Sequence, residues 1–340
     1  MMTTAVNQQV KNSHIAVMVW APFEERTASF AEQLNAPLYN VHYFQYKQPW
    51  IAPFKYLPMA VKTLSLLIKH RPDYVYITNP PSFAPFFVYL YCLMFGKAYV
   101  MDTHSPALYS RKWAWTLPLQ RWLARRALVN IVDQPRYKAL FQSWGARAIV
   151  LQRPPDRPIP FHELQPEAPL EPFQVAVINT FAVDEPLDII LEAARALPDI
   201  QFHITGDTSR AAAADINNAP DNIIWTGYLR GNDYWNLISS THVTLALTTY
   251  EYSLLGGAQD GVMLGKPLIL SDQPVLREFF TKGTVFVENT TEGVINGVKQ
   301  ARAEHSSLAR AITELAEEKR THWQQTFNEL ESLLSHNATS

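Results

Sequence analysis

An aspartate and a histidine lie two positions apart in Asp102-Thr-His104, directly after the apolar residues 98–101. A carboxylate beside an imidazole can orient the ring and support its protonated form, which is useful next to a reacting hydroxyl or a leaving oxygen. The alternative is that Asp102 caps the following turn and that His104 is merely exposed. Asp102 and His104 are therefore candidate catalytic residues.

Two adjacent glycines, Gly256 and Gly257, mark a second candidate site together with Asp260. Glycines at a strand-to-helix turn let a ligand approach the backbone, and the first N–H groups of a helix favour a phosphate. A carboxylate one turn into that helix, at Asp260, could accept hydrogen bonds from a ribose diol. The simpler alternative is a glycine-capped helix whose dipole favours an acidic residue near its start.

Short polar segments supply further candidates. Thr205-Gly-Asp207 and Trp225-Thr-Gly-Tyr228 each follow an apolar run. The Tyr228 ring could stack on a base, although core packing is the commoner use of an aromatic residue. Glu24 and Glu25 follow the first apolar run, and either carboxylate could act as a base toward a hydroxyl. Exposure to solvent is the alternative for at least one of them.

Apolar runs alternate with helical patterns along the chain, as expected for parallel strands joined by helices. The runs predicted as strands fall into two series. They are 14–20, 39–44, 74–78, 98–102 and 128–133 in the first series, and 173–179, 200–205, 222–225, 243–247, 267–270 and 284–287 in the second. The sequence therefore predicts an α/β protein with two doubly wound, Rossmann-like domains.

A proline-rich segment separates the two series. Seven prolines lie between Leu151 and Phe173, and such a segment lacks backbone donors and resists helix formation. We therefore predict an N-terminal domain over 1–152, a linker over 153–172 and a C-terminal domain over 173–305. Residues 306–340 have the apolar spacing of a long final helix with a tail, and we expect this helix to pack back on the first domain.

The net charge of −2 hides an asymmetry between the two halves of the chain. Residues 1–150 carry 16 Lys and Arg against 6 Asp and Glu, whereas residues 151–340 carry 13 against 25. A basic half favours an anionic surface or a phosphate-bearing ligand, although halves of opposite charge could simply attract each other.

Several classes of protein are disfavoured. No run reaches the roughly 18 apolar residues that a membrane-spanning helix needs. The basic half has no helix-turn-helix, zinc-finger or RNA-recognition pattern, so we expect no nucleic acid partner. No Gly-x-Gly-x-x-Gly follows the first strand of either domain, which disfavours a dehydrogenase. The one cysteine, Cys92, has no second cysteine to pair with in the chain and fits a reducing compartment.

In their order along the chain, these segments resemble those of the GT-B glycosyltransferases, a large family that includes mannosyltransferases acting on lipid-linked sugars. The β-mannosyltransferase that extends lipid-linked chitobiose is especially similar, with a like Asn-Pro-Pro, Asp-x-His and Arg-Pro linker. The matching segments are Pro72-Asp73 with Asn79-Pro-Pro81, Asp102-x-His104, Arg153-Pro154-Pro155, Ile204-Thr-Gly-Asp207, Trp225-Thr-Gly-Tyr228 and Asp260-x4-Gly265-Lys-Pro267.

The resemblance implies a GT-B fold whose two domains face a central cleft. It implies transfer of a hexosyl group from a GDP- or UDP-sugar, with no metal and no cofactor. His104 would border the donor sugar, and Asp102, Glu24 and Glu25 complete the candidate catalytic residues. The second domain would hold most of the donor. The candidate donor-binding residues are Thr180, Asp207, Tyr228, Arg230, Glu251, Ser253, Leu254, Leu255, Gly256, Gly257 and Asp260.

The sequence departs from the family pattern after the first strand of the second domain. Many relatives carry an Arg and a Lys there, whereas residues 179–185 include no cation. The diphosphate would then be met by backbone and helix ends, or by one of four other cations. These are Arg153, Arg230, Lys266 and Arg277.

A basic and aromatic surface is indicated in the first domain. Lys55, Lys62 and Lys69 recur every seven residues, and residues 111–126 combine Arg, Lys and Trp. Such a surface suits an anionic membrane leaflet, although the apolar side of the first helix could equally belong to the core. We hypothesise a cytoplasmic protein, peripheral at the inner face of the membrane, that acts in polysaccharide biosynthesis on a glycan or lipid-linked acceptor.

Two other functions stay open. The same architecture could serve a nucleotide-sugar epimerase or hydrolase, because fold does not fix function. The missing cations after Asn179 would also suit a non-catalytic partner protein that keeps the fold without binding a donor.

Overall fold

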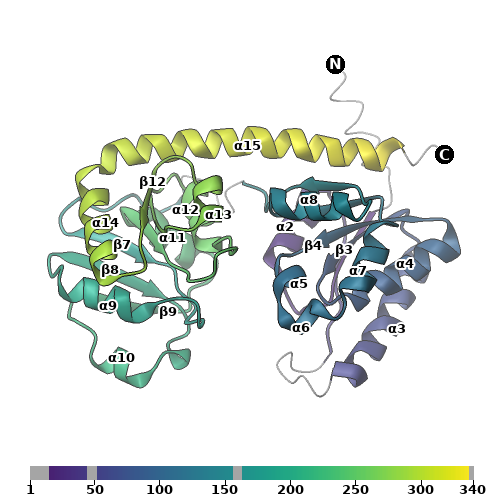
Figure 1. The fold of residues 1–340 in the computed structure, drawn as a ribbon, viewed down its shortest axis with the longest axis horizontal. Helices are drawn as coiled ribbons and strands as arrows, with labels where there is room; N and C mark the ends of the chain where they lie inside the picture. Colours follow the sequence, from purple (N-terminus) through teal and green to yellow (C-terminus); the bar gives the residue numbers. More distant parts are fainter. Residues whose placement is uncertain (1–14, 44–51, 156–162, 337–340) are drawn as a thin grey trace. The chain divides into compact units, whose positions relative to one another are not determined.

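The computed structural model describes residues 15–43, 52–155 and 163–336, and the chain divides into two compact units (Figure 1). The first unit comprises Met1–Pro154 and His322–Ser340, and the second comprises Pro155–Thr321. Each unit is built around its own parallel sheet of six strands with helices on both faces, so the predicted α/β class is confirmed.

In the first unit the strands are ordered β2-β1-β3-β4-β5-β6 and all neighbouring pairs are parallel. The strands are β1 (Ile15–Val19), β2 (Leu38–Asn40), β3 (Tyr74–Asn79), β4 (Ala98–Thr103), β5 (Val129–Val132) and β6 (Ala148–Val150). The helices are α2 (Glu25–Gln33), α3 (Ala52–His70), α4 (Phe83–Phe95), α5 (Pro106–Tyr109), α6 (Arg111–Ala114), α7 (Leu117–Ala124) and α8 (Pro135–Ser143).

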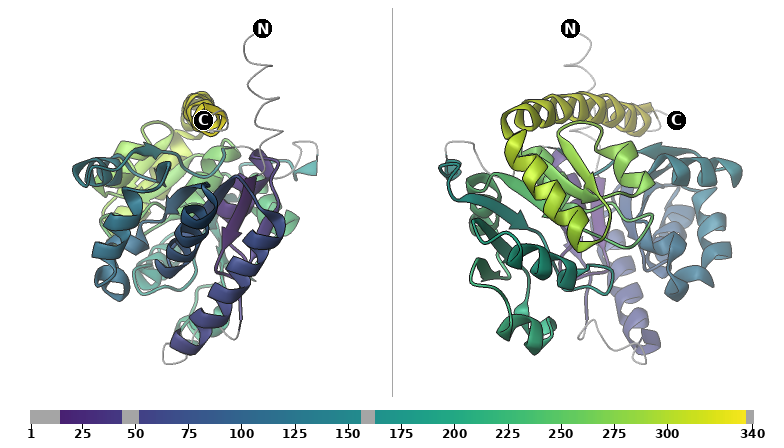
Figure 2. Two further views of the ribbon diagram at one scale, coloured as in Figure 1. Left: turned by 90° about the vertical axis from the view of Figure 1, so that its right-hand side faces the viewer. Right: turned by 60° about the vertical axis from the view of Figure 1, so that its left-hand side comes forward.

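Both faces of this sheet are buried, which is why its strands read as continuous apolar runs. Successive residues of β3 alternate between the faces: Val75 and Ile77 join one core, and Tyr74 and Tyr76 join the other. The first core is completed by α3, α4, α7 and α8, and the second by α2 and the end of the last helix. Figure 2 shows the ribbon from two further sides. The predicted strand at 39–44 is shorter in the structure, and residue 44 lies outside the described residues.

In the second unit the strands are ordered β12-β11-β10-β7-β8-β9 and are again parallel. The strands are β7 (Phe173–Val177), β8 (Ile200–Thr205), β9 (Ile223–Gly227), β10 (Val243–Ala246), β11 (Leu268–Ser271) and β12 (Thr284–Val287). The helices are α9 (Leu187–Arg195), η3 (Thr208–Arg210), α10 (Ala213–Asn217), α11 (Asn232–Ser240), α12 (Gly256–Met263), α13 (Pro274–Phe279), α14 (Thr291–Ala303) and α15 (His305–His336). Helices α9 and α14 cover one face, and α12, α13 and the start of α15 cover the other.

The long helix α15, yellow in Figure 1, contributes to the core of each unit. Its residues Ile312 and Leu315 pack with the second unit. Its residues Trp323, Phe327 and Leu330 pack with the first. Their spacing of three and four residues keeps them on one side of the helix. The final helix therefore packs on the first unit, as predicted.

Part of the predicted linker is attached to the second unit. Residues 156–162 lie outside the described residues, but Gln165 and Ala168 donate backbone hydrogen bonds to the last turns of α11. The Glu167 carboxylate pairs with the buried Lys266 at 2.5 Å. We call residues 163–171 the arm, and it is held by hydrogen bonds and an ion pair instead of being a free connection.

Helix α3 differs from the expected basic stripe. Lys55 is buried, with 7% exposure, whereas Leu57, Val61 and Ile68 are exposed at 68%, 58% and 46%. Burial and the nearby Lys112 lower the pKa of Lys55. Leu57, Val61 and Ile68, which we call the α3 stripe, follow helical spacing, so the apolar side of this helix belongs only in part to the core. None of the helices in the described ranges is long and apolar enough to cross a membrane.

Candidate functional site

At the carboxyl ends of the first unit's central strands, Asp102 lies in the middle of a hydrogen-bonded network. Its side chain has no exposed surface. Arg26, in the first turn of α2, donates to both carboxylate oxygens, with Nη2 to Oδ1 at 2.7 Å and Nε to Oδ2 at 3.1 Å. The hydroxyl of Tyr76, on the neighbouring strand β3, donates to Oδ2 at 2.7 Å. The two hydrogen bonds from Arg26 form a bidentate pair, which fixes the plane of the Asp102 carboxylate.

This network keeps Asp102 ionised. Burial raises the pKa of its carboxyl, but the charge of Arg26 and the hydrogen bonds from His104 and Tyr76 outweigh burial and lower the pKa to about 2. The same interactions raise the pKa of Arg26, in spite of burial. A permanent carboxylate is therefore present under His104 at neutral pH.

The backbone and one ring nitrogen of His104 are both held in place. Its backbone N–H donates to the carbonyl of Asn79 at 2.8 Å, which ties the end of β4 to the end of β3. Its Nε2 lies 3.3 Å from Oδ2 of Asp102 and 4.0 Å from Oε2 of Glu24. Burial lowers the pKa of the imidazole, but the Asp102 carboxylate outweighs this effect and the pKa is raised.

The two candidate glutamates have different roles. Glu24 is the N-cap of α2 and accepts hydrogen bonds from the backbone N–H groups of Arg26 and Thr27 and from the Thr27 hydroxyl. Glu25 is more exposed and lies 3.1 Å from Arg153. The structure thus brings together Asp102, His104 and Glu24, whereas Glu25 is turned toward Arg153.

The donor-site candidates lie where the strands of the second unit end. Thr180 follows β7, Asp207 follows β8, Tyr228 and Arg230 follow β9, and residues 251–257 follow β10. Strands β7 and β10 are neighbours whose chain connections run to opposite sides of the sheet. In open parallel sheets the crevice at such a switch point binds ligands.

The two glycines at the start of α12 are not equivalent. A Cβ on Gly257 would lie 2.5 Å from Cγ2 of Ile178, so this glycine lets the helix pack on the loop after β7. Among the described residues, nothing lies within 4 Å of a Cβ built on Gly256. The N-cap residue Leu255 makes no side-chain capping hydrogen bond within the described chain. The open approach to the helix N-terminus is therefore at Gly256.

The other predicted loop residues lie around this helix start. Glu251 and Gly256 are exposed, and Ser253, Leu254 and Leu255 are half-buried. The loop after β10 is held by a hydrogen-bond network that the sequence did not indicate. Thr248 donates to Asp184 at 2.7 Å, and the side chain of Asn289 donates to the carbonyl of Thr248 at 2.9 Å.

Asp260 is almost completely buried, with 5% exposure. It accepts a hydrogen bond of 2.6 Å from the hydroxyl of Tyr234 on α11. The tyrosine was not among the candidates, because nothing in a helical segment marks one residue as the partner of a distant carboxylate. Whether Asp260 also meets a ribose stays a prediction.

The loop after β7 satisfies its own amides. The Glu185 carboxylate accepts hydrogen bonds from the backbone N–H groups of Thr180 and Ala182, at 2.7 Å and 3.1 Å, and from the Thr180 hydroxyl. The candidate contact at Thr180 is therefore engaged within the loop. Asp207 likewise caps its own turn, accepting from Ser209.

The structure separates the cations that could meet a diphosphate. Lys266 precedes β11 and is buried against Glu167. It therefore lies at the amino ends of the strands, opposite the loop after β10, and is excluded as a partner of a diphosphate bound at that loop. Arg153 belongs to the first unit and pairs with Glu25. Arg277 pairs with Asp272. Arg230 lies 4.9 Å from the ring of Tyr228, which is 63% exposed.

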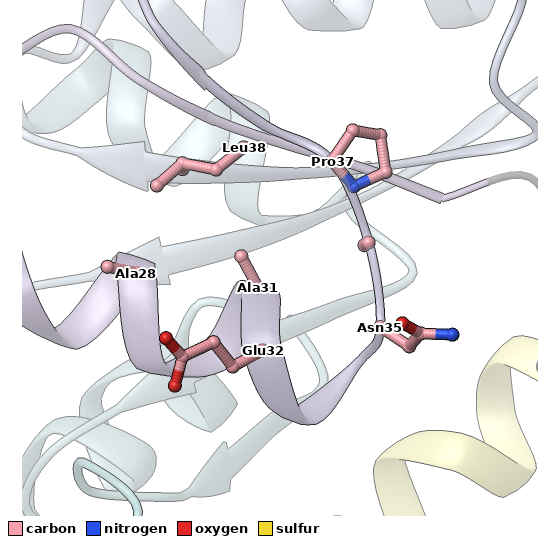
Figure 3. Close-up of a pocket in the computed structure, with 7 residues that line it drawn as sticks. Ala28, Ala31, Glu32, Asn35, Pro37 and Leu38 are labelled. Atoms are coloured by element: carbon pink, nitrogen blue, oxygen red, sulfur yellow. The ribbon is translucent and has the colours of Figure 1, made fainter. Parts of the chain in front are cut away.

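A hollow of about 470 Å³ lies elsewhere on the first unit (Figure 3). It is lined by Ala28, Ala31, Glu32, Asn35, Ala36, Pro37 and Leu38. These residues belong to α2, to the loop that follows it and to the first position of β2. None of the candidate catalytic or donor-binding residues lines it.

Solved structures with the same architecture include that of HepE from Anabaena in complex with UDP and glucose, with a TM-score of 0.67 at 14% identity over 94% of this chain and 100% of that one. Sucrose-phosphate synthase from Thermosynechococcus elongatus gives a TM-score of 0.68 at 12% identity over 98% and 94%. The fold is GT-B. A putative UDP-N-acetylglucosamine 2-epimerase from Listeria monocytogenes is also similar, with a TM-score of 0.61 at 12% identity over 93% and 97%.

Sequence comparison adds a narrower finding. Residues 188–332 match the model of a family described as glycosyl transferase-like. A comparison with curated proteins finds no match. The family match covers most of the second GT-B unit, including α12 and the loop after β10.

Proposed function

We propose that this GT-B protein is a glycosyltransferase that moves a hexosyl group from a nucleoside diphosphate sugar to a glycan or lipid-linked acceptor. The observation that carries the proposal is the open, uncapped start of α12 at Gly256, at the switch point of the second sheet and inside the segment that matches glycosyl transferases. The solved HepE complex with UDP-glucose, which has this fold, supports a nucleotide-sugar donor.

In this proposal the first N–H groups of α12 bind the donor diphosphate, because a helix N-terminus stabilises anions. Tyr228, whose ring is exposed, stacks on the base, with Arg230 alongside. Asp260 meets the ribose. The proposal includes no metal, so a chelator should leave turnover unchanged.

The first unit supplies the catalytic groups. The acceptor oxygen attacks the anomeric carbon, the bond between that carbon and the diphosphate oxygen breaks, and the acceptor hydroxyl loses its proton. We propose that Glu24 or His104 accepts this proton. Oε2 of Glu24 and Nε2 of His104 lie 4.0 Å apart, at the carboxyl ends of the strands of the first sheet. The ionised Asp102 supports His104 throughout.

The α3 stripe supports a place at a membrane. Exposed leucine, valine and isoleucine side chains are flanked on the same helix by the exposed Lys62 and Lys69. Apolar side chains with adjacent cations bind anionic bilayers. We propose that α3 holds the protein at the inner face of the membrane, where a lipid-linked acceptor would be met.

Liposome flotation tests the membrane assignment. Changing both Leu57 and Val61 to Ser should abolish binding to vesicles containing phosphatidylserine, whereas Leu170→Ser, at another exposed leucine, should not. Equal flotation of all three proteins, or binding insensitive to salt, would refute it.

A thermal-shift panel tests the donor assignment. A nucleotide sugar that binds the native state raises the melting temperature, and the panel should include both GDP-sugars and UDP-sugars. Stabilisation by none of them would favour a non-catalytic partner protein, as the missing cations in 179–185 would allow. Product analysis then separates transfer from epimerisation, an alternative kept open by the similarity to a putative epimerase.

A further inference from the structure

The two ring nitrogens of His104 have different surroundings. Nε2 faces two carboxylates, with Oδ2 of Asp102 at 3.3 Å and Oε2 of Glu24 at 4.0 Å. Within the described part of the chain, Nδ1 makes no hydrogen bond, and the side chain keeps 22% of its surface exposed. The ring therefore has one nitrogen turned to the protein and one that is available.

What fixes this orientation is the set of donors around Asp102. Arg26 donates hydrogen bonds to Oδ1 at 2.7 Å and to Oδ2, and the hydroxyl of Tyr76 donates to Oδ2 at 2.7 Å. Arg26 is itself held by the carbonyl of Leu151 at 2.8 Å. The carboxylate can neither turn nor gain a proton easily, so the interaction left to it is with Nε2 of His104.

We infer that Arg26 and Tyr76 are positioning residues that commit Nε2 of His104 to Asp102 and leave Nδ1 to contact the substrate. The inference rests on the proposed function for the identity of that substrate, but the state of the ring can be measured without it. Neutral His104 then carries its proton on Nε2, which donates to Asp102, and presents a lone pair at Nδ1 as a base or hydrogen-bond acceptor.

The charges that face the ring decide how each variant should behave. Asp102 and Glu24 favour the imidazolium, whereas Arg26 disfavours it. Tyr76 acts indirectly, because its hydroxyl withdraws negative charge from Oδ2. Removing Tyr76 or Arg26 should therefore strengthen the attraction between Asp102 and the ring and raise the pKa of His104.

The experiment is an NMR titration of His104 in the full-length protein, with ¹⁵N-labelled imidazole to identify the tautomer. In the wild type above the pKa, Nε2 should carry the proton. Tyr76→Phe should raise the pKa of His104, because Oδ2 of Asp102 then keeps more of its negative charge for the ring. Tyr74→Phe is the matched control, because Tyr74 is buried on the same face of β3 and should leave the pKa unchanged.

A second variant guards against a purely structural result. Arg26→Gln should raise the pKa of His104 by about one to three units, since a neighbouring positive charge is lost, and Arg26→Lys should restore part of the difference. A proton on Nδ1 in the wild type would overturn the inference. So would a pKa of His104 that is the same in folded Tyr76→Phe and in the wild type.

The readout separates this inference from the proposed function. If no donor stabilises the protein but the tautomer and the pKa shifts are as expected, the proposed function fails and the positioning role stands. If a transfer reaction is found, the acidic limb of its pH–rate profile should move to higher pH in Tyr76→Phe by the same shift that NMR measures. If the profile does not move in a variant whose ring pKa has shifted, Nδ1 of His104 takes no part in the reaction.

Discussion

Asp102 binds an arginine on α2, a tyrosine on β3 and the histidine that follows β4, so its carboxylate joins three segments of the first unit. Its buried ion pair with Arg26 does not by itself imply a gain in stability, because desolvation opposes the attraction of the two charges. Removing one partner is different, since the other charge is left buried alone.

Asp102→Asn should therefore lower the free energy of unfolding by about 3–5 kcal/mol at pH 7, measured by urea unfolding. The matched control is Asp73→Asn, which breaks the partly exposed pair with Lys97 and should cost less than about 1 kcal/mol. Equal losses in the two variants would contradict the role assigned to the buried pair.

The same residue predicts a pH dependence. The pKa of Asp102 is about 2 in the native state, below the roughly 3.9 of an unfolded chain. Between these values the unfolded state binds more protons, so the stabilisation is present above pH 4 and is lost as the pH falls toward 2. The stability gap between wild type and Asp102→Asn should narrow over this window, and curves that stay parallel would argue against it.

Sequence patterns could identify Asp102 and His104 but not Arg26 or Tyr76. The first two lie two positions apart at the end of a strand, and the carboxyl ends of parallel strands are where binding sites form. Arg26 is 76 positions away in a helix, where an arginine reads as a surface residue. Tyr76 lies inside an apolar strand and reads as core. Their meeting depends on the order β1-β3-β4, which the sequence does not reveal.

At the scale of elements, the start of α12 combines a packing position and an open position in consecutive residues. Gly257 meets Ile178, and Gly256 meets open space. The sequence predicted a pair of glycines with one role. It could not show which glycine packs and which is open, because this depends on how closely the helix approaches the loop after β7.

Gly257→Ala should destabilise the protein by about 1–3 kcal/mol, because its methyl group would overlap Ile178. Gly256→Ala should leave the melting temperature nearly unchanged but weaken binding of the nucleotide sugar found in the thermal-shift panel. Adding Ile178→Ala to Gly257→Ala should recover stability. The proposed donor site would be wrong if Gly256→Ala bound the donor as tightly as the wild type.

The arm gives a second prediction at this scale. His242 is buried and neutral: its Nδ1 accepts from the N–H of Gln174 at 2.8 Å, and its Nε2 lies 3.0 Å from the carbonyl of Ala168. Burial lowers its pKa, and the hydrogen bond to Ala168 and the charge of Glu167 offset this only in part. Protonation would place two N–H groups against each other at Gln174.

Because the native state of His242 binds its proton less tightly than the unfolded chain, stability should fall as the pH drops below about 6.5. Thermal melts of the wild type and of His242→Gln between pH 8 and 5 would measure this as a steeper loss in the wild type. His322→Gln, at an exposed histidine, is the control and should follow the wild-type curve.

At the scale of the whole molecule, the sequence was sufficient for the α/β class with two Rossmann-like domains and for the final helix, whereas the GT-B fold was implied by the family resemblance. The alternation of strands and helices and the restart after the prolines determined the class. It was not sufficient for Lys55 or Lys266, two lysines expected near ligands or membranes that are buried instead. A long side chain can be buried when a partner such as Glu167 is close, and that proximity is a tertiary property.

Helix α15 links the stability of the two units, because its residues complete both cores. Leu330→Ala should lower the free energy of unfolding of the first unit by about 2–5 kcal/mol, although this helical residue is over 170 positions along the chain from the strands of that unit. Gln325→Ala, exposed on the same helix, should have little effect. Domain-resolved hydrogen exchange would measure both, and a Leu330→Ala loss confined to the second unit would contradict the assignment.

The same helix sets the order in which the protein can mature during translation. The first unit needs residues from His322 onward, yet its main segment ends at Pro154. At about 5–20 residues per second, the ribosome needs roughly 10–30 s to reach the closing segment, and over that time the α2 face of the first sheet has no cover from α15. Nascent chains of this protein should depend on chaperones for longer than the size of either unit would suggest.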